Sequence, residues 1–122
     1  MQLNIFLQRL RDMQDSIAFN DTIALIDLLY DFTPTAFRNG PLLNTAGQNN
    51  GSCKIFSFAQ MHGLSQQQTL HCFGDYYRND VLGNPGGNDH RNIRNFMNSG
   101  WTGITFNTAA LTPKPEPAES YS

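Results

Sequence analysis

Cys53 is the residue whose surroundings most favour chemistry. It lies in the segment QNNGSCKIFSFA (48–59), directly after a glycine-containing turn and at the predicted start of an apolar helix. The dipole and free N–H groups of a helix N-terminus stabilise a thiolate, and Lys54 adds positive charge nearby. The nucleophile of a cysteine hydrolase or transferase is one interpretation of this pattern. The alternative is a small buried cysteine that only packs.

A nucleophilic cysteine needs a base, and the sequence offers three histidines. His62 ends the same predicted helix, about 13 Å of helical rise from Cys53, which is too far along a rigid helix. His71 has an aspartate at i+4, so a surface pair is sufficient to explain it. His90 follows the loop NPGGND and comes after Cys53 in the chain, which is the order in papain-like enzymes. Cys53 and His90 are therefore the candidate catalytic pair, with a structural role as the alternative for each.

Three arginines form a second candidate, an anion-binding site. Arg91 and Arg94 are i, i+3 neighbours on one side of a predicted helix, and Arg78 precedes them in the chain. With the N-terminus of that helix they could hold a phosphate or a carboxylate. The alternative is a set of salt bridges to three nearby aspartates: Asp75, Asp80 and Asp89.

Composition limits the classes of function. A chain of 122 residues with a net charge of −2 fits one domain with no bulk attraction to nucleic acid or to an anionic membrane. The N-terminal residues MQLNIFLQRLRDM lack the features of a cleavable signal peptide, so we expect Cys53 and Cys72 to stay reduced. Their spacing matches no zinc motif, and no phosphate loop or dinucleotide fingerprint is present. We therefore expect no metal and no cofactor.

Five helices must position these residues. Apolar periodicity predicts them at about 2–13, 21–30, 53–62, 65–78 and 90–98. The predicted N-caps are Asn20, Ser52, Ser65 and either Asn88 or Asp89, and the predicted stops are Gly63 and Gly100. The third helix carries a single charge in CKIFSFAQM, so it is predicted to be the buried centre of the fold.

Strand signals are weaker than the helix signals. The stretch TPTAFRNGPLLN (33–44) is predicted to be extended on both sides of an Asn39-Gly40 turn, and WTGITF (101–106) alternates like a half-buried strand. The sequence thus predicts a mainly helical α+β domain with a small antiparallel sheet over residues 1–111. The proline-rich remainder, 112–122, is predicted to be disordered.

The second part of the chain concentrates the features of a site. All ten glycines and ten of the asparagines lie within 37–106, and that segment carries a charge of +2. Glycine and asparagine between bulky apolar residues indicate shaped turns. We therefore expect any functional cleft to be lined from three places: the turn before Cys53, residues 78–80, and residues 89–94.

Four runs of sequence carry a family resemblance. They are DFTPTAFRNG (31–40), GQNNGSCKIFSFAQMHGLS (47–65), QTLHCFGDYYRNDVL (68–82) and DHRNIRNFMNSGWTGITF (89–106). In this order they resemble the HopJ type III effector family over residues 14 to 111. The resemblance implies a bacterial, effector-like protein, and it assigns no catalytic or binding residue.

Two localisations and two mechanisms follow as alternatives. The resemblance implies delivery into a host cell, where the partner would be a host protein. The predicted amphipathic helix at the N-terminus, in place of a flexible serine-rich segment, favours a housekeeping role in the cytoplasm of the producing cell. The mechanism is either that of a Cys/His enzyme or that of a module binding a small anion or a partner protein.

Overall fold

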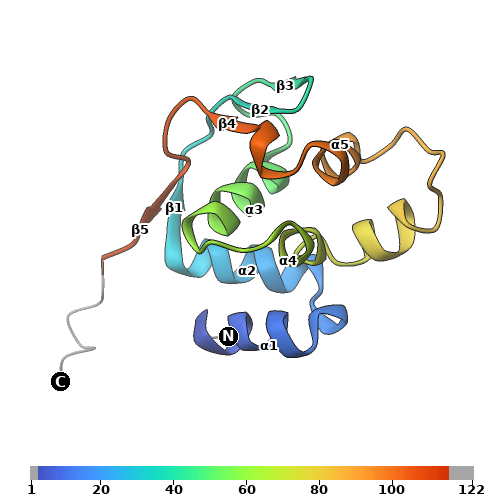
Figure 1. The fold of residues 1–122 in the computed structure, drawn as a ribbon. Coiled ribbons are helices and arrows are strands. Elements are labelled where there is room, and N and C mark those ends of the chain that lie inside the picture. The colour runs from blue at the N-terminus through green and yellow to red at the C-terminus, as the bar shows by residue number, and fades with distance from the viewer. Residues whose placement is uncertain (1–2, 116–122) are drawn as a thin grey trace.

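Five α-helices and five short strands make up the part of the chain that the computed structural model describes, residues 3–115 (Figure 1). A π-helical turn (η2) and two 3-10 turns (η1 and η3) complete it. The helical elements are α1 (Leu3–Asp12), η1 (Gln14–Ser16), α2 (Phe19–Leu29), α3 (Asn50–Met61), α4 (Gln66–His71), η2 (Tyr76–Val81), α5 (Arg91–Ser99) and η3 (Gly100–Gly103). The strands are β1 (Tyr30–Phe32), β2 (Phe37–Asn39), β3 (Leu42–Asn44), β4 (Ile104–Phe106) and β5 (Leu111–Pro113).

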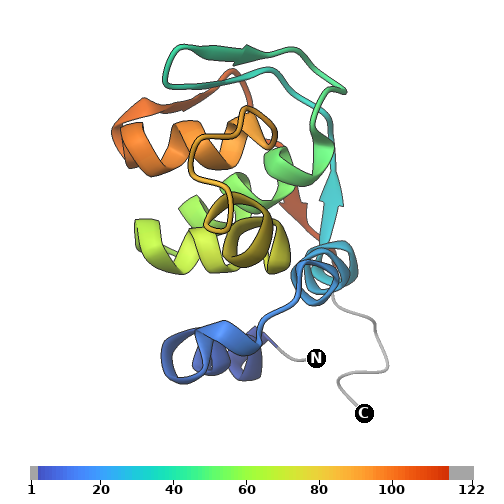
Figure 2. The same ribbon diagram turned by 90° about the vertical axis from the view of Figure 1, so that its right-hand side faces the viewer.

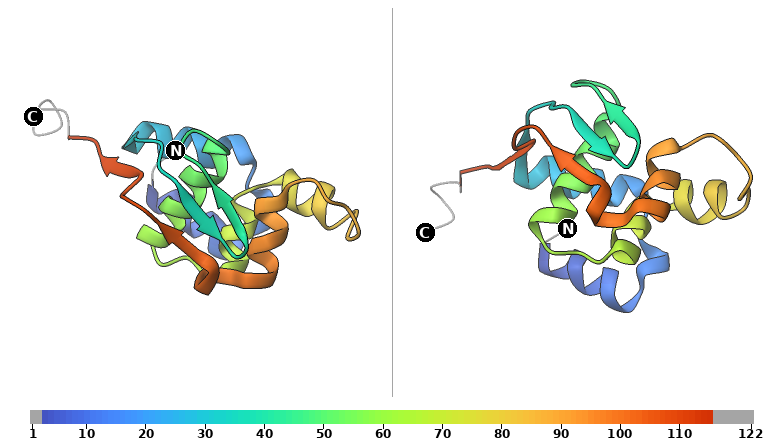
Figure 3. Two further views of the ribbon diagram at one scale, coloured as in Figure 1. Left: turned by 90° about the horizontal axis from the view of Figure 1, so that it is seen from above. Right: turned by 45° about the horizontal axis from the view of Figure 1, so that its top comes forward.

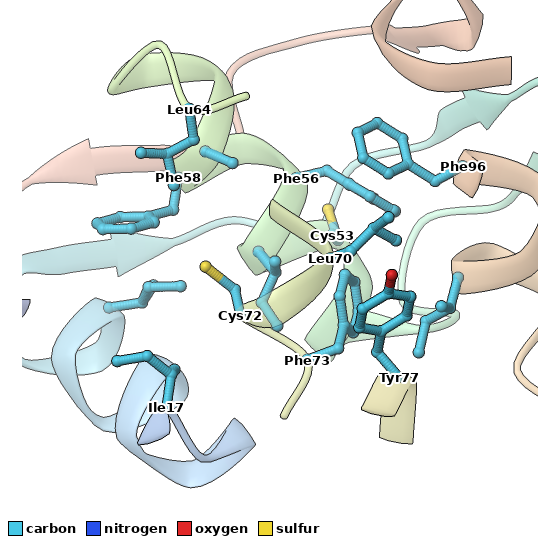
Figure 4. Packing of buried hydrophobic residues seen from close by; sticks show 14 of the residues in the cluster. Ile17, Cys53, Phe56, Phe58, Leu64, Leu70, Cys72, Phe73, Tyr77 and Phe96 are labelled. Carbon is cyan, nitrogen blue, oxygen red and sulfur yellow. The ribbon is translucent and has the colours of Figure 1, made fainter. Parts of the chain in front are cut away.

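Helix α3 lies at the centre of this fold, with helices below and beside it and strands above it (Figures 1 and 2). Ile55, Phe56, Phe58 and Ala59 have no solvent exposure. Phe56 contacts the rings of Phe37, Phe73, Phe96 and Trp101. Figure 4 shows part of this cluster from close by. The predicted mainly helical α+β fold around a buried third helix is confirmed.

The strands form two small antiparallel sheets. In the first, β2 pairs with both β3 and β4, and Figure 3 shows the β2–β3 hairpin crossing over α3. The hairpin turn is formed by Gly40 and Pro41, one residue later than the predicted Asn39-Gly40 turn, because Asn39 still pairs with Leu42. Gly40 takes a positive φ of 59°, which favours glycine. In the second sheet β1 pairs with β5, a pairing that the sequence analysis did not predict.

Several element boundaries differ from the prediction because the caps were misassigned. Helix α2 begins at Phe19, where the side chain of Asp21 accepts the N–H of Ala18, and Asn20 is not its cap. Helix α3 begins at Asn50, so Ser52 lies inside it. The predicted capping box of α4 is confirmed, since Ser65 and Gln68 exchange hydrogen bonds.

The fourth and fifth helices also differ from the prediction. α4 ends at His71 rather than at Arg78, because the chain turns at Gly74 with a φ of +61° before it enters η2. α5 begins at Arg91 with His90 as its cap, in place of Asn88 or Asp89, and it ends at Gly100 as predicted.

The C-terminal prediction needs correction. Only residues 104–106 of the predicted strand 101–106 are extended, since η3 occupies the rest. Disorder does not begin at residue 112, because Thr112 and Pro113 belong to β5. Lys114 then donates its N–H to Leu29 O and its ammonium to Asp27 O, which extends the contact with the end of α2. The predicted disorder of residues 116–122 lies outside the described residues.

Gly74 and Gly63 make a matched test of close packing. Both have a positive φ, +61° and +63°. A Cβ on Gly74 would lie 2.5 Å from the backbone N of Phe19, whereas a Cβ on Gly63 would meet nothing within 4 Å. We expect Gly63→Ala to cost about 1–2 kcal/mol of unfolding free energy from left-handed strain alone. Gly74→Ala should lower the unfolding free energy clearly more, because the start of α2 must move to make room for the new Cβ. Equal losses of unfolding free energy for the two variants, measured by urea denaturation, would contradict this packing.

Candidate functional site

A cavity of about 910 Å³ lies where the starts of α3 and α5 come together beside the β2–β3 hairpin. The hairpin contributes residues 42–44, and the start of α5 with the residues before it contributes 88–93. The turn before α3 contributes Gln48 and Asn49, and the first turn of α3 contributes Gly51 and Ser52. Phe19, Phe73 and Tyr76 complete the lining. Two of the three segments expected at a cleft therefore meet here, while residues 78–80 are not part of the lining.

Both helix starts at the cavity have unusual caps. Asn49 and His90 adopt left-handed conformations, and between residues 3 and 115 they are the two non-glycine residues with positive φ. The first backbone N–H groups with an acceptor are those of Cys53, which bonds to Asn49 O, and Arg94, which bonds to His90 O. The amides of residues 50–52 and 91–93 thus have no acceptor within residues 3–115, as is normal for the first turn of a helix.

Four asparagines hold the polar wall of the cavity in place. Asn92 of α5 donates to Asn44 Oδ1 and accepts from the amides of Asn39 and Asn44 at 3.0 and 3.1 Å. Asn44 also accepts from Asn49 Nδ2 at 2.7 Å. Because Asn39, Asn44 and Asn92 are buried, hydrogen bonds are needed to keep them there. Each has such bonds, although Asn39 Oδ1 has no partner within residues 3–115. The network joins β2, β3, the turn before α3 and α5.

Sequence reasoning did not single out this network. Its one local signal is the excess of asparagine in residues 37–106, and that signal does not say which asparagines meet. Asn39 and Asn92 are 53 positions apart. Nothing in their separate neighbourhoods predicts that they pair.

The three predicted anion-binding arginines separate in the structure. Arg91 lines the cavity, is exposed, and has no hydrogen-bond or ion-pair partner within residues 3–115. Arg94 instead binds Asp89 Oδ1 at 2.7 Å, Asp89 O at 2.6 Å and Asn84 O at 2.9 Å, which ties down the loop before α5. The salt-bridge alternative therefore holds for Arg94.

Arg78 lies away from the cavity, where its guanidinium contacts the link between α1 and α2. Its guanidinium donates to the carbonyls of Gln14 and Ile17, in the link between α1 and α2, and to the carbonyl and Nδ1 of His71. Since a guanidinium only donates, His71 Nδ1 accepts. Burial, and then the charge of Arg78, lowers the pKa of His71, while the charge of Asp15 opposes that shift. Arg78 thus fastens the N-terminal segment and does not line the cavity.

Cys53 is placed inside the core and not in the cavity (Figure 4). Its side chain is 1% exposed, and its Sγ lies 3.8 Å from the carbonyl oxygen of Thr35. Burial raises the pKa of its thiol, against smaller opposing effects of hydrogen bonds to Thr35 and Ser57. The expected free N–H at Cys53 is not found, because α3 begins three residues earlier than predicted and the N–H of Cys53 is bonded to Asn49 O.

His90, the predicted catalytic base, and Cys72, the second cysteine, also have defined surroundings in the structure. His90 Nε2 lies 3.1 Å from Asp80 Oδ2 and 3.9 Å from Asp89 Oδ2, and its ring packs on Tyr76. Within residues 3–115, the polar side chains next to His90 Nε2 are thus the carboxylates of Asp80 and Asp89 and not a cysteine thiol. Cys72 is a free, fully buried thiol whose pKa burial raises to about 12. Cys53 is also free, as expected.

Two further searches of residues 3–115 complete the description. No helix there is both long enough and apolar enough to cross a membrane. No group of three or more His, Cys, Asp or Glu side chains in that part of the chain is placed to hold a metal ion.

Thiol reactivity tests the placement of the two cysteines. Because both are buried with raised pKa values, we expect each to react with iodoacetamide at pH 7.5 at least about tenfold more slowly in the native protein than in urea. Peptide mapping assigns the label to each site, and Cys72→Ser isolates Cys53. Rapid native labelling of Cys53 would restore it as a candidate nucleophile.

Comparison with known proteins gives a family and no activity. The family model described as "HopJ type III effector protein" matches residues 3–111. No curated protein matches. The fold is similar to that in "Crystal structure of unknown function protein VPA0580", with a TM-score of 0.92 and 54% sequence identity over 93% of this chain and 95% of that chain. With a family model covering nearly all of the described fold, this chain belongs to the HopJ type III effector protein family.

Proposed function

We propose that this HopJ-family protein is a binding module whose cavity between the starts of α3 and α5 takes a small organic anion. The observation that carries the proposal is Arg91, whose exposed guanidinium on the cavity wall has no hydrogen-bond or ion-pair partner in the described part of the chain. A guanidinium binds carboxylates and phosphates in a bidentate manner. The arginine thus supplies a cationic anchor that no part of the described fold uses.

The charges around Arg91 support an anion rather than a cation. Asp89 also lines the cavity, but its carboxylate is paired with Arg94 at 2.7 Å. The hydrogen bond from Arg94 holds the pKa of Asp89 below its usual range, so this pair is charged and mutually neutralised at neutral pH. Asp80, which lies 3.1 Å from His90, does not line the cavity. Among the described residues that line the cavity, Arg91 is therefore a cationic side chain without an ion-pair partner.

The backbone adds donors beside this charge. The amides of residues 50–52 and 91–93 belong to two helix N-termini at the same cavity, and the helix dipole favours an anion there. A volume of about 910 Å³ falls within the range of small-molecule sites, roughly 300–1,000 Å³. The enzyme alternative has less support, since Cys53 is buried away from this cavity and its pKa is raised.

Inorganic phosphate and matched arginine variants test the proposal. Arg91→Gln should weaken phosphate binding by roughly tenfold, which corresponds to losing about 1.5 kcal/mol of charge-assisted hydrogen bonding. Arg38→Gln removes the same charge from an exposed position of β2, outside the cavity, and should change affinity little. Isothermal titration measures affinity, and amide NMR shifts of residues 50–52 and 91–93 locate the ion. Equal affinities for the two variants would contradict the proposal.

The family match supports a second proposal, that the protein is delivered by a type III system into a host cell. The competing proposal is a cytoplasmic protein of the producing bacterium. A translocation reporter fused to the C-terminus separates them when it is measured in host cells with an intact and with a disabled secretion apparatus. Delivery should require the intact apparatus, and retention in the bacterium with both strains would support the cytoplasmic alternative.

A further inference from the structure

The cavity has an aromatic wall beside its polar one. The rings of Phe19 and Tyr76 meet edge to face with centroids 5.0 Å apart, and Tyr76 and His90 are inclined by only 33° with centroids 5.2 Å apart. All three residues line the cavity. They come from α2, η2 and the cap of α5, so the tertiary fold builds the row.

Tyr76 is the exposed member of this row. Its side chain is 43% exposed, and its hydroxyl has no hydrogen-bond partner within residues 3–115. Leu43, on the hairpin side of the same cavity, is 53% exposed. Ligand sites combine apolar and aromatic surface with a few placed polar groups, and this cavity shows that combination.

The aromatic row and Arg91 line the same cavity, whose volume is about 910 Å³. His90 packs on Tyr76, and Arg91 is the next residue after His90 in the chain. On the α3 side, Gly51 approaches Phe19 so closely that a Cβ would lie 3.1 Å from the ring. The first turn of α3 therefore lies against the aromatic row.

We propose that the anion bound in this cavity carries a planar aromatic ring, which stacks on Tyr76 while its acidic group binds Arg91. This inference rests on the proposed anion-binding function and names the class of ligand: an aromatic phosphate ester or an aromatic carboxylate. A ring on an aromatic platform gains from electrostatic complementarity as well as from burial of apolar area. A saturated ring of the same size gains only from burial.

Phenyl phosphate and cyclohexyl phosphate make the matched pair of probes. They carry the same charge on rings of similar size, and only one ring is aromatic. In isothermal titrations of the full chain we expect phenyl phosphate to bind about three- to tenfold more tightly than cyclohexyl phosphate. Upfield ring-current shifts of the phenyl protons should accompany binding. Benzoate and cyclohexanecarboxylate repeat the comparison for a carboxylate and decide which acid the site prefers.

Variants of Tyr76 assign the effect to this ring. Tyr76→Ala should abolish the preference for the aromatic probe while inorganic phosphate still binds, and Tyr76→Phe should keep the preference. Leu82→Ala removes a comparably exposed apolar side chain, 48%, that does not line the cavity, and should behave like the unmodified protein. Circular dichroism and the unfolding midpoint show whether each variant is folded.

The outcomes separate this inference from the proposed function. Equal affinity for the two probes, together with Arg91-dependent binding of inorganic phosphate, would overturn the aromatic ligand and leave the anion site standing. A preference for phenyl phosphate that survives Tyr76→Ala would also overturn it. Failure of phosphate and of all four organic probes to bind would overturn the proposed function itself.

Discussion

The burial of Phe56 is the constraint on which the rest of the structure depends. This ring of α3 contacts Phe37 of β2, Phe73 after α4, Phe96 of α5 and Trp101 of η3, with centroids 4.9–6.5 Å apart. Each contact brings in an element from a different part of the chain. Aromatic pairs add geometric preference to the area that they bury, so the cluster sets orientation as well as proximity.

The asparagine network connects the aromatic core around Phe56 to the wall of the cavity. Phe96 brings α5 against α3, and Asn92, one turn earlier in α5, then meets Asn39 and Asn44 of the hairpin. Buried amides are costly unless they are bonded, so the helix and the hairpin cannot shift independently. The cavity wall that carries Arg91 is thereby placed by side chains that face away from solvent, and the site is preorganised rather than formed by loops alone.

The fold gives structural roles to three residues that the sequence pattern had suggested for catalysis or anion binding: Cys53, Arg78 and Arg94. Cys53 lies beside Ser52, which lines the cavity, yet its own side chain points into the core. Arg78 and Arg94 are used to fasten the N-terminal segment and the loop before α5. The cavity is left with Arg91, which has no partner among the residues that the structure describes, together with two helix starts and an aromatic row. These features favour binding over nucleophilic catalysis.

From the sequence alone, five helices, the buried position of α3 and a hairpin turn at Gly40 could be predicted, and the starts of α3 and α5 could be named among the stretches lining a cleft. These depend on apolar spacing and turn residues, which act over a few positions. The tertiary structure was needed to show that α3 starts three residues before Cys53, that β5 continues past residue 111, and that the starts of α3 and α5 meet. It also showed which of Arg78, Arg91 and Arg94 has no partner within residues 3–115. Arg78 finds its carbonyl partners 61 and 64 positions away, and Tyr76 finds Phe19. Such partners are selected by how the helices pack around Phe56, and no local propensity encodes that choice.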